Sequence, residues 1–173
     1  MKNPGDKNDF TELKEKEIYN TFLLTIAGWQ GYIDMPAIYS TVSLMPASRF
    51  FVSLPRAVKV IRAMAAGAMQ RDDLSKSRRR MYAEIYRRVM KQLPDGFSIP
   101  VKVPKNGRDK SNRLFRAAVA TVIRQPAPEF YTDIEHIRKI IKRKHKEAAA
   151  ARLAYFKDRQ RRLSFCCTKI NNK

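Results

Sequence analysis

The chain has 173 residues, the length of one ordinary domain or of two very small ones. Its 36 Lys and Arg residues stand against 16 Asp and Glu residues, which gives a formal charge of +20. An enzyme acting on a neutral small molecule gains nothing from such self-repulsion, whereas a protein that meets a polyanion does. A hydrophobic content of 44% is too high for a disordered chain, and only 6 Gly argue against a turn-rich β fold.

Short sequence patterns exclude several other classes of protein. No apolar run approaches the roughly 18 residues of a membrane span, and the polar first ten residues lack the apolar core of a signal peptide. We therefore expect no membrane partner and a cytoplasmic location, or one inside a particle assembled there. Cys166 and Cys167 are adjacent, which excludes a disulfide framework, and His136 and His145 do not complete a zinc site with them.

Charge is distributed unevenly along the chain. The segments 1–34, 35–70, 71–112 and 113–173 carry net charges of −2, +4, +7 and +11. The second half is therefore expected to make most of any contact with a polyanion.

The chain contains an internal repeat. When Pro46 is aligned with Pro126, an offset of 80, the segments 41–53 and 121–133 share Thr, Val, Pro, Ala and Phe at matching positions. Upstream, residues 17–19 and 84–86 are both Glu-Ile-Tyr, at an offset of 67. Chance similarity between amphipathic helices is the alternative, but the agreement of proline and aromatic positions favours a true repeat.

The pattern of the first copy predicts three helices, at residues 10–27, 36–44 and 54–66. The first has a core stripe of Leu13, Ile18, Phe22 and Ile26, and the third has one of Ala57, Val60, Ile61 and Met64. Pro46 ends the second helix, Ser53 is a good N-cap for the third, and Gly67 ends it.

The second copy repeats this order, with helices expected at residues 77–92, 111–124 and about 134–163. Asp133 takes the place of Ser53 as N-cap, and the last helix has a core stripe of Ile137, Ile140 and Ile141. No Gly or Pro interrupts the chain after this stripe, so the helix continues and would span roughly 45 Å at ~1.5 Å per residue.

The predicted fold is therefore all-α, with two tandem three-helix, helix-turn-helix-like repeats and a long basic C-terminal helix. The predicted divisions are a first repeat at 1–70, a charged linker at 71–80, a second repeat at 77–145 with a Pro/Gly loop at 93–111, and a basic helix and tail at 146–173. Asp72 and Asp73 in the linker are interpreted as charge partners for Arg71 and Arg78.

A short helix, a connector and a helix with one basic face follow the general plan of DNA-reading helix-turn-helix proteins. The connector is longer than the standard three or four residues. For the third helix of the first copy, a merely solvated face is the favoured interpretation, whereas the second copy favours nucleic acid. The candidate phosphate-binding residues are Arg56, Lys59, Arg62, Arg78, Arg79, Arg80, Arg138, Lys139, Lys142, Arg143, Lys144 and Lys146.

Aromatic residues recur at matching points between the helices. Phe50, Phe51, Phe130 and Tyr131 could stack on bases, but their position between helices favours a core role. Trp29, between Gly28 and Gly31, is expected to pack the end of the first helix against the bundle.

No catalytic arrangement is recognisable. The chain has no Gly-rich phosphate loop, no paired carboxylates in an apolar context and no Cys–His arrangement with catalytic spacing. We predict a non-enzymatic protein without cofactor or metal, which binds nucleic acid and most readily double-stranded DNA, although the residues do not distinguish DNA from RNA.

The alternative is a structural or assembly subunit of a particle, able to form homo-oligomers. The extended C-terminal helix fits either prediction. It can be a basic arm on nucleic acid, or an assembly helix that uses the apolar residues Leu153, Tyr155, Phe156, Leu163 and Phe165.

The repeated Pro-Ala-x-x-Phe-[Phe/Tyr] pattern also carries a resemblance. It stands here at residues 46–51 and 126–131, and the second occurrence follows Glu-Ile-Tyr-Arg-Arg-Val at 84–89. These pieces resemble small basic proteins of unassigned function from Bacteroidetes and their phages. The resemblance implies a phage or mobile-element setting and no site residues.

Overall fold

The computed structural model describes the backbone of residues 5–68, 74–100 and 109–170, and the side chains in these ranges except 5–9, 158 and 160–170. Every regular element in these ranges is a helix, which confirms the all-α prediction. The helices are α1 (Gly5–Ala27), α2 (Met35–Leu44), α3 (Leu54–Ala65), α4 (Lys76–Gln92), α5 (Lys110–Arg124) and α6 (Ile134–Ile170). The predicted linker residues Arg71, Asp72 and Asp73, and residues 101–108 of the Pro/Gly loop, lie outside the described residues.

Helix ends lie close to where proline, glycine and capping residues place them. α3 ends at a positive-φ glycine, Gly67 (φ +65°), as expected. The carbonyl oxygens of Ser53 and Asp133 accept the equivalent helical hydrogen bonds from the amides of Ala57 and Ile137, at 2.9 and 3.0 Å. Ser53 is the N-cap residue of α3, as predicted, although its hydroxyl makes no capping hydrogen bond.

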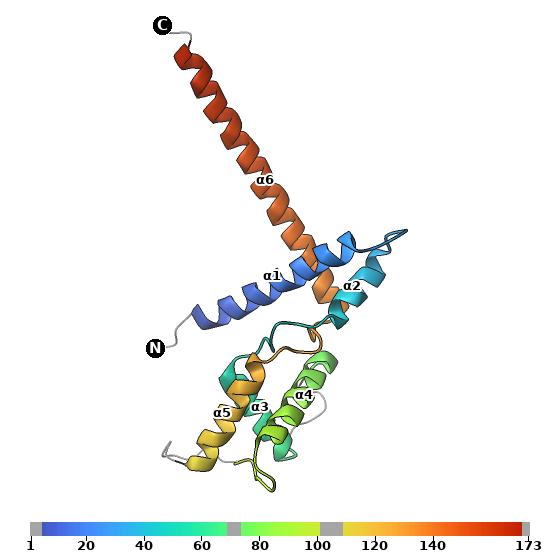
Figure 1. Cartoon of the computed structure of the whole chain (residues 1–173), viewed down its shortest axis with the longest axis vertical. Coiled ribbons are helices and arrows are strands. Elements are labelled where there is room, and N and C mark those ends of the chain that lie inside the picture. The colour runs from blue at the N-terminus through green and yellow to red at the C-terminus, as the bar shows by residue number, and fades with distance from the viewer. Residues whose placement is uncertain (1–4, 69–73, 101–108, 171–173) are drawn as a thin grey trace.

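The helices pack in two groups that are not consecutive in the chain. α1, α2 and the first turns of α6 form one group, and α3, α4 and α5 form the other (Figure 1). In the described part of the chain, α3 does not pack against α1 or α2, and α6 does not pack against α4 or α5. The third helix of each predicted repeat therefore lies with the first two helices of the other.

Two extended connectors cross between the groups. At the crossing, the amide of Ala47 donates to the carbonyl of Ala127 at 3.0 Å, and the amide of Ala127 donates back at 2.9 Å. Both alanines are 2% exposed. Pro46 and Pro126 precede them and stop α2 and α5, since a proline disfavours helix in the residue before it. Positions 47 and 127 differ by the same 80 residues as the predicted repeat.

Aromatic side chains fill the space around the crossing. Phe50 and Phe130 are fully buried, and the ring of Phe50 stacks on that of Tyr131 with centroids 6.1 Å apart. Tyr131 has a left-handed backbone conformation (φ +49°), which is uncommon for a bulky residue. The core role predicted for these residues is confirmed, with Phe51 half-buried.

The apolar stripes of the helices supply the rest of the core. Ile18 and Phe22 of α1 are fully buried, and so are Ile137 and Ile141 of α6. Leu13 was expected to join them but is 52% exposed. It lies five residues before Ile18, about 140° around the helix from the buried face at 3.6 residues per turn.

The end of α1 is closed by Trp29. This side chain is partly buried against the core, as predicted, and its indole nitrogen donates to the carbonyl of Tyr32 at 3.1 Å.

A charged network ties α4 to both connectors. Glu84 accepts hydrogen bonds from Arg87 and Arg88 at 2.7 Å. Arg88 also donates to the carbonyl of Pro126 at 2.8 Å, and its guanidinium lies 5.1 Å from the ring centroid of Phe50. Glu84 thus orients an arginine that contacts the two chain segments at the crossing.

Enlarging an alanine at the crossing should destabilise the fold. We expect Ala127→Leu to lower the free energy of unfolding by about 1–3 kcal/mol, because a larger side chain has no room between the connectors. Chemical denaturation measures this change. The exposed Ala117 of α5 provides the control, whose change to Leu should stay within about 0.5 kcal/mol. Equal effects of the two changes would contradict the crossing.

The contribution of Glu84 should depend on pH. Its hydrogen bonds from Arg87 and then Arg88 lower its pKa from 4.5 to about 2, against the effect of burial. The charged carboxylate therefore stabilises the fold above pH 4.5, and this contribution is lost as the pH falls toward 2. We expect Glu84→Gln to be less stable than the wild type in urea denaturation at pH 7 and equal to it near pH 2. A difference in stability that does not change with pH would contradict this account.

Candidate nucleic-acid interface

Basic charge is concentrated in the group of α3, α4 and α5. These three helices carry fourteen Lys and Arg residues and a single acidic residue, Glu84. By contrast, α1 carries five acidic residues and three lysines, and α2 carries no charge. The packing thus places α3 next to the basic helices α4 and α5, and brings the acidic α1 against the start of α6.

α5 presents a basic stripe that was missed in the sequence. Lys110, Arg113 and Arg116 are exposed at three-residue spacing, opposite a buried face that includes Phe115, Val119 and Val122. Asp109 caps the helix by accepting from the amide of Ser111 at 3.0 Å. No ion pair to these three cations occurs within the described ranges. The three-residue spacing of cations on a helix was the signal that could have identified them.

α3 presents two of its three candidate cations to solvent. Arg56 and Lys59 are exposed; burial raises the pKa of the Tyr82 hydroxyl on α4, and the nearby Arg56 acts in the opposite direction. The two residues therefore share a helix group with the candidates Arg78, Arg79 and Arg80 of α4.

The placement of Arg62 on the solvent face is wrong. Its guanidinium is buried against α5, donates to Asn112 and lies 5.5 Å from the ring centroid of Phe115. Burial, together with the nearby Arg116, lowers its pKa. The reason is that α3 packs against both α4 and α5, so more of its surface is covered than one apolar stripe predicts.

The three candidates at the start of α4 have different surroundings. Arg80 pairs with Glu129 at 3.0 Å, and Arg79 donates to the carbonyl of Leu74 at 3.4 Å. Arg78 is exposed and lines a cavity.

Half of the α6 candidates are held in ion pairs. Arg143 pairs with Glu15 of α1 and with Glu147, Lys144 pairs with Glu147 at 2.8 Å, and Arg138 lies 3.5 Å from Glu135. Lys139, Lys142 and Lys146 are exposed and have no ion pair within the part of the chain that the structure describes. Arg143 therefore also fixes α6 against α1, which sequence spacing alone does not reveal.

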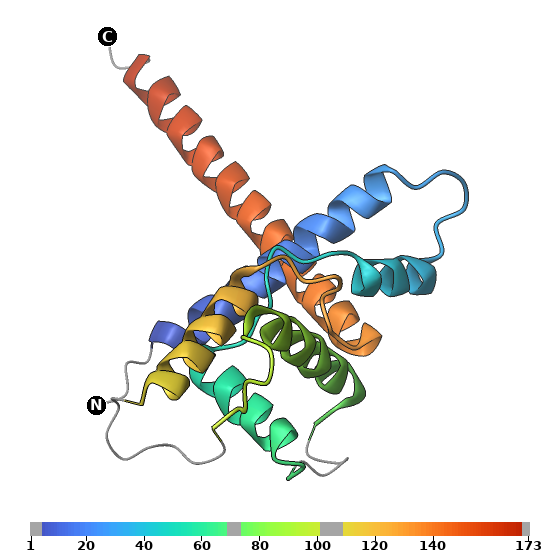
Figure 2. The same cartoon turned by 60° about the horizontal axis from the view of Figure 1, so that its bottom comes forward.

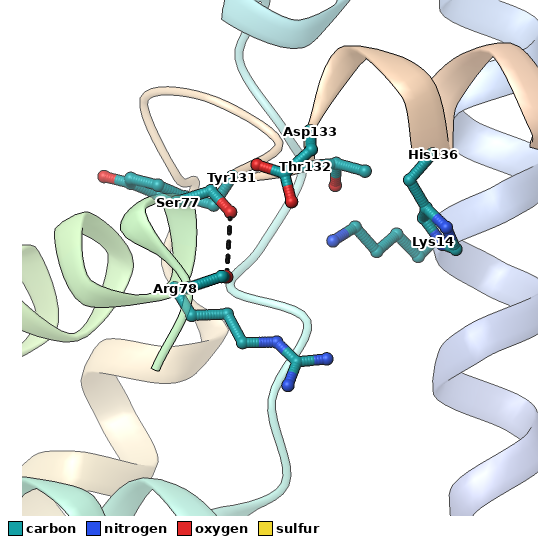
Figure 3. A pocket seen from close by; sticks show the side chains of 8 residues that line it. Lys14, Ser77, Arg78, Tyr131, Thr132, Asp133 and His136 are labelled. Carbon is teal, nitrogen blue, oxygen red and sulfur yellow. Dashed lines mark hydrogen bonds between the residues drawn. The ribbon is translucent and has the colours of Figure 1, made fainter. Parts of the chain in front are cut away.

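A cavity of about 320 Å³ opens between α1, the start of α4 and the start of α6 (Figure 3). It is lined by Lys14, Ser75, Ser77, Arg78, Tyr131, Thr132, Asp133 and His136. Figure 3 shows the ammonium group of Lys14 pointing into the cavity, toward Thr132 and Asp133. Lys14 was not among the predicted site residues, because nothing in the acidic sequence around it marks it as special.

Lys14 occupies an unfavourable electrostatic position. Burial and the nearby Arg78 lower its pKa from 10.5 to about 8, although Asp133 acts in the opposite direction. No carboxylate within the described ranges forms an ion pair with its ammonium group. Lys14 is half-buried, and a cation withdrawn from water without a close counter-ion costs stability; such groups concentrate at functional sites.

Within the described ranges, no group of three or more His, Cys, Asp or Glu residues is placed to hold a metal ion. No described helix combines the length and the apolar character that a membrane crossing requires. Comparison with protein-family profiles, with curated proteins and with solved structures finds no match to this chain.

Replacing Lys14 should stabilise the fold. At pH 7 the lysine is charged in both the folded and the unfolded chain, so the folded state bears the full cost of burial, a cost that falls as the pH rises from 8 to 10.5. We expect Lys14→Met to melt at a higher temperature than the wild type at pH 7, with the gap narrowing toward pH 10.5. A variant that melts lower at pH 7 would show that Lys14 is well compensated in the folded state.

Proposed function

We propose that the protein is a non-enzymatic nucleic-acid-binding protein whose ligand is double-stranded DNA. The observation that carries this proposal is the charge of the α3–α4–α5 group, fourteen basic residues against one acidic residue that is itself paired. Such a surface gains free energy by neutralising phosphates and releasing their counter-ions.

The exposed cations of this surface extend over two adjoining helices. Arg56 and Lys59 lie on α3, and Lys110, Arg113 and Arg116 lie on α5, which packs against α3. Arginine can contact phosphates and can also read guanine edges. In this proposal the α3–α4–α5 group contributes more to DNA binding than α6 does, because half of the candidate cations of α6 already form ion pairs with carboxylates of α1 or α6.

We further propose that the chain consists of two copies of one three-helix, helix-turn-helix-like unit that exchange their third helices. The reciprocal hydrogen bonds between Ala47 and Ala127 support this, because they join positions that the repeat equates. A pair of equivalent residues bonded in this way has a local two-fold axis, as at the interface of a symmetric dimer. A setting in the cytoplasm or in a phage particle, as the resemblance implies, is compatible with this proposal.

The far part of α6 favours a second candidate function, that of an assembly subunit. Beyond its contacts with α1 and α2, α6 extends away from the other helices (Figures 1 and 2). Leu153, Tyr155 and Phe156 on this part are 63%, 64% and 56% exposed. Exposed apolar side chains on a protruding helix are suited to contact with another subunit.

The response to salt distinguishes the two functions. We expect the double variant Arg113→Gln/Arg116→Gln to bind duplex DNA more weakly. The slope of the logarithm of the binding constant against the logarithm of the salt concentration should also become less steep, by roughly 0.9 for each of up to about two lost phosphate contacts. Fluorescence anisotropy with a labelled duplex at several salt concentrations measures both quantities. Binding that tolerates salt would favour assembly through apolar faces instead.

A matched control separates local contact from net charge. Lys16→Gln/Arg87→Gln also removes two positive charges, but from α1 and from an arginine already paired with Glu84. We expect this control to keep most of the affinity and slope, and thermal melts to show that both variants are folded. Equal losses in the two variants would show that α5 does not form a specific contact surface.

A further inference from the structure

The cavity between α1, α4 and α6 has the composition of an anion site. A cation enters it from each of two helices, Lys14 from α1 and Arg78 from α4. Ser75 and Ser77 add hydroxyl groups, whose oxygens lie 3.3 Å apart, and His136 adds a ring from α6. Ammonium, guanidinium and hydroxyl groups are the side chains that donate hydrogen bonds to phosphate.

The start of α4 adds backbone donors at the same place. The first amides of a helix have no partner within it, and they carry the positive end of the helix dipole. The N-cap residue Ser75 makes no side-chain capping bond, and the first turn holds no acidic residue. The start of α6, in contrast, follows Asp133 and contains Glu135. An anion in the cavity is therefore best placed at the α4 side.

Lys14 supplies the second observation that points to a ligand. Its ammonium group is directed into the cavity and has no ion-pair partner in the described chain. The fold therefore retains a charge that costs stability, and an anion would compensate it. Two neighbouring carboxylates do not fill this role, since Glu15 pairs with Arg143 and Asp133 does not approach Lys14 to ion-pair distance.

We propose that this cavity is a phosphate-binding site, with Lys14 and Arg78 as its principal cations, which receives a phosphoryl group of the bound nucleic acid. The identity of the ligand rests on the proposed function, whereas the anion site does not. The size of the cavity, about 320 Å³, admits a phosphoryl group together with part of the sugar that carries it.

Calorimetric titration of the full chain with sodium phosphate or sodium sulfate tests the site directly. We expect Lys14→Met and Arg78→Gln each to weaken binding about tenfold or more, because each removes a charge-assisted hydrogen bond. The matched control Lys16→Gln removes a neighbouring charge that does not line the cavity, and this variant should bind as the wild type does. Binding that survives in both cavity variants, or no binding to the wild type, would overturn the site.

Proton uptake provides a second readout that a structural role for Lys14 would not produce. Sulfate does not titrate near pH 8, so any proton taken up when it binds at this pH must bind to the protein. The titratable groups that line cavities together with Lys14 are Glu15 of α1, Arg78 of α4, His136 of α6, and Asp133 and Tyr131 of the connector. We expect an uptake of up to about half a proton in the wild type, measured from the binding enthalpy in two buffers, and much less in Lys14→Met. Equal uptake in the two proteins would contradict the role of Lys14.

A parallel binding experiment with duplex DNA identifies the source of the phosphoryl group. We expect Lys14→Met to weaken binding of a duplex, and comparison of 5′-phosphorylated with 5′-hydroxyl ends shows whether a terminal or an internal phosphate occupies the cavity. If the wild type binds sulfate with proton uptake but does not bind DNA, the anion site stands and the proposed function fails. If DNA binds equally well to wild type and Lys14→Met, nucleic acid is not the source.

Removing the carboxylate at the cavity wall should have the opposite effect. We expect Asp133→Asn to tighten sulfate binding, because it removes the like charge that faces the anion. Weaker binding in this variant would show that Asp133 orients Lys14 for another purpose and would overturn the assignment.

Discussion

The two hydrogen bonds between Ala47 and Ala127 decide which helices pack together. Because the connectors cross there, each passes its following helix to the opposite group. The close approach requires small side chains at both positions, and the buried rings of Phe50 and Phe130 enclose it. Arg88, held by Glu84, completes the junction by donating to the carbonyl of Pro126. The distribution of charge and the cavity next to α4 both follow from this crossing.

The crossing also separates charge. It unites α3 with α4 and α5, which together carry a large positive excess, and brings the acidic α1 against the basic start of α6. The pair of Arg143 with Glu15 belongs to this second contact. Self-repulsion among the cations of the first group favours an anionic ligand, since a bound polyanion relieves it.

Local structure was predictable because its causes are local. Pro46, Pro126 and Gly67 mark helix ends, and the Ile137, Ile140 and Ile141 stripe marks a buried face, all within a few residues of chain. The packing of α3 with α4 and α5, and of α6 with α1 and α2, was not predictable in this way, since an apolar stripe shows which face is buried but not which helix covers it.

The errors in the candidate site have the same origin. Arg62 lies on a polar arc of α3 in the sequence, yet α5 covers it in the fold. Lys14 stands among acidic residues in the sequence, yet the fold directs its ammonium group into a cavity that Arg78 also lines. Both depend on contacts between helices distant in the chain, whereas the stripe of Lys110, Arg113 and Arg116 could have been found from spacing alone.

The central claim is that nucleic acid lies on the α3–α4–α5 group. Chemical footprinting tests it most directly, by modifying lysines and arginines with and without duplex DNA and locating the modified residues by mass spectrometry. The account predicts that DNA protects Lys59, Lys110, Arg113 and Arg116 and leaves Lys16 of α1 as reactive as in the free protein. Protection confined to α6 beyond its contacts with α1 and α2, or protection of Lys16 equal to that of the α5 cations, would contradict it.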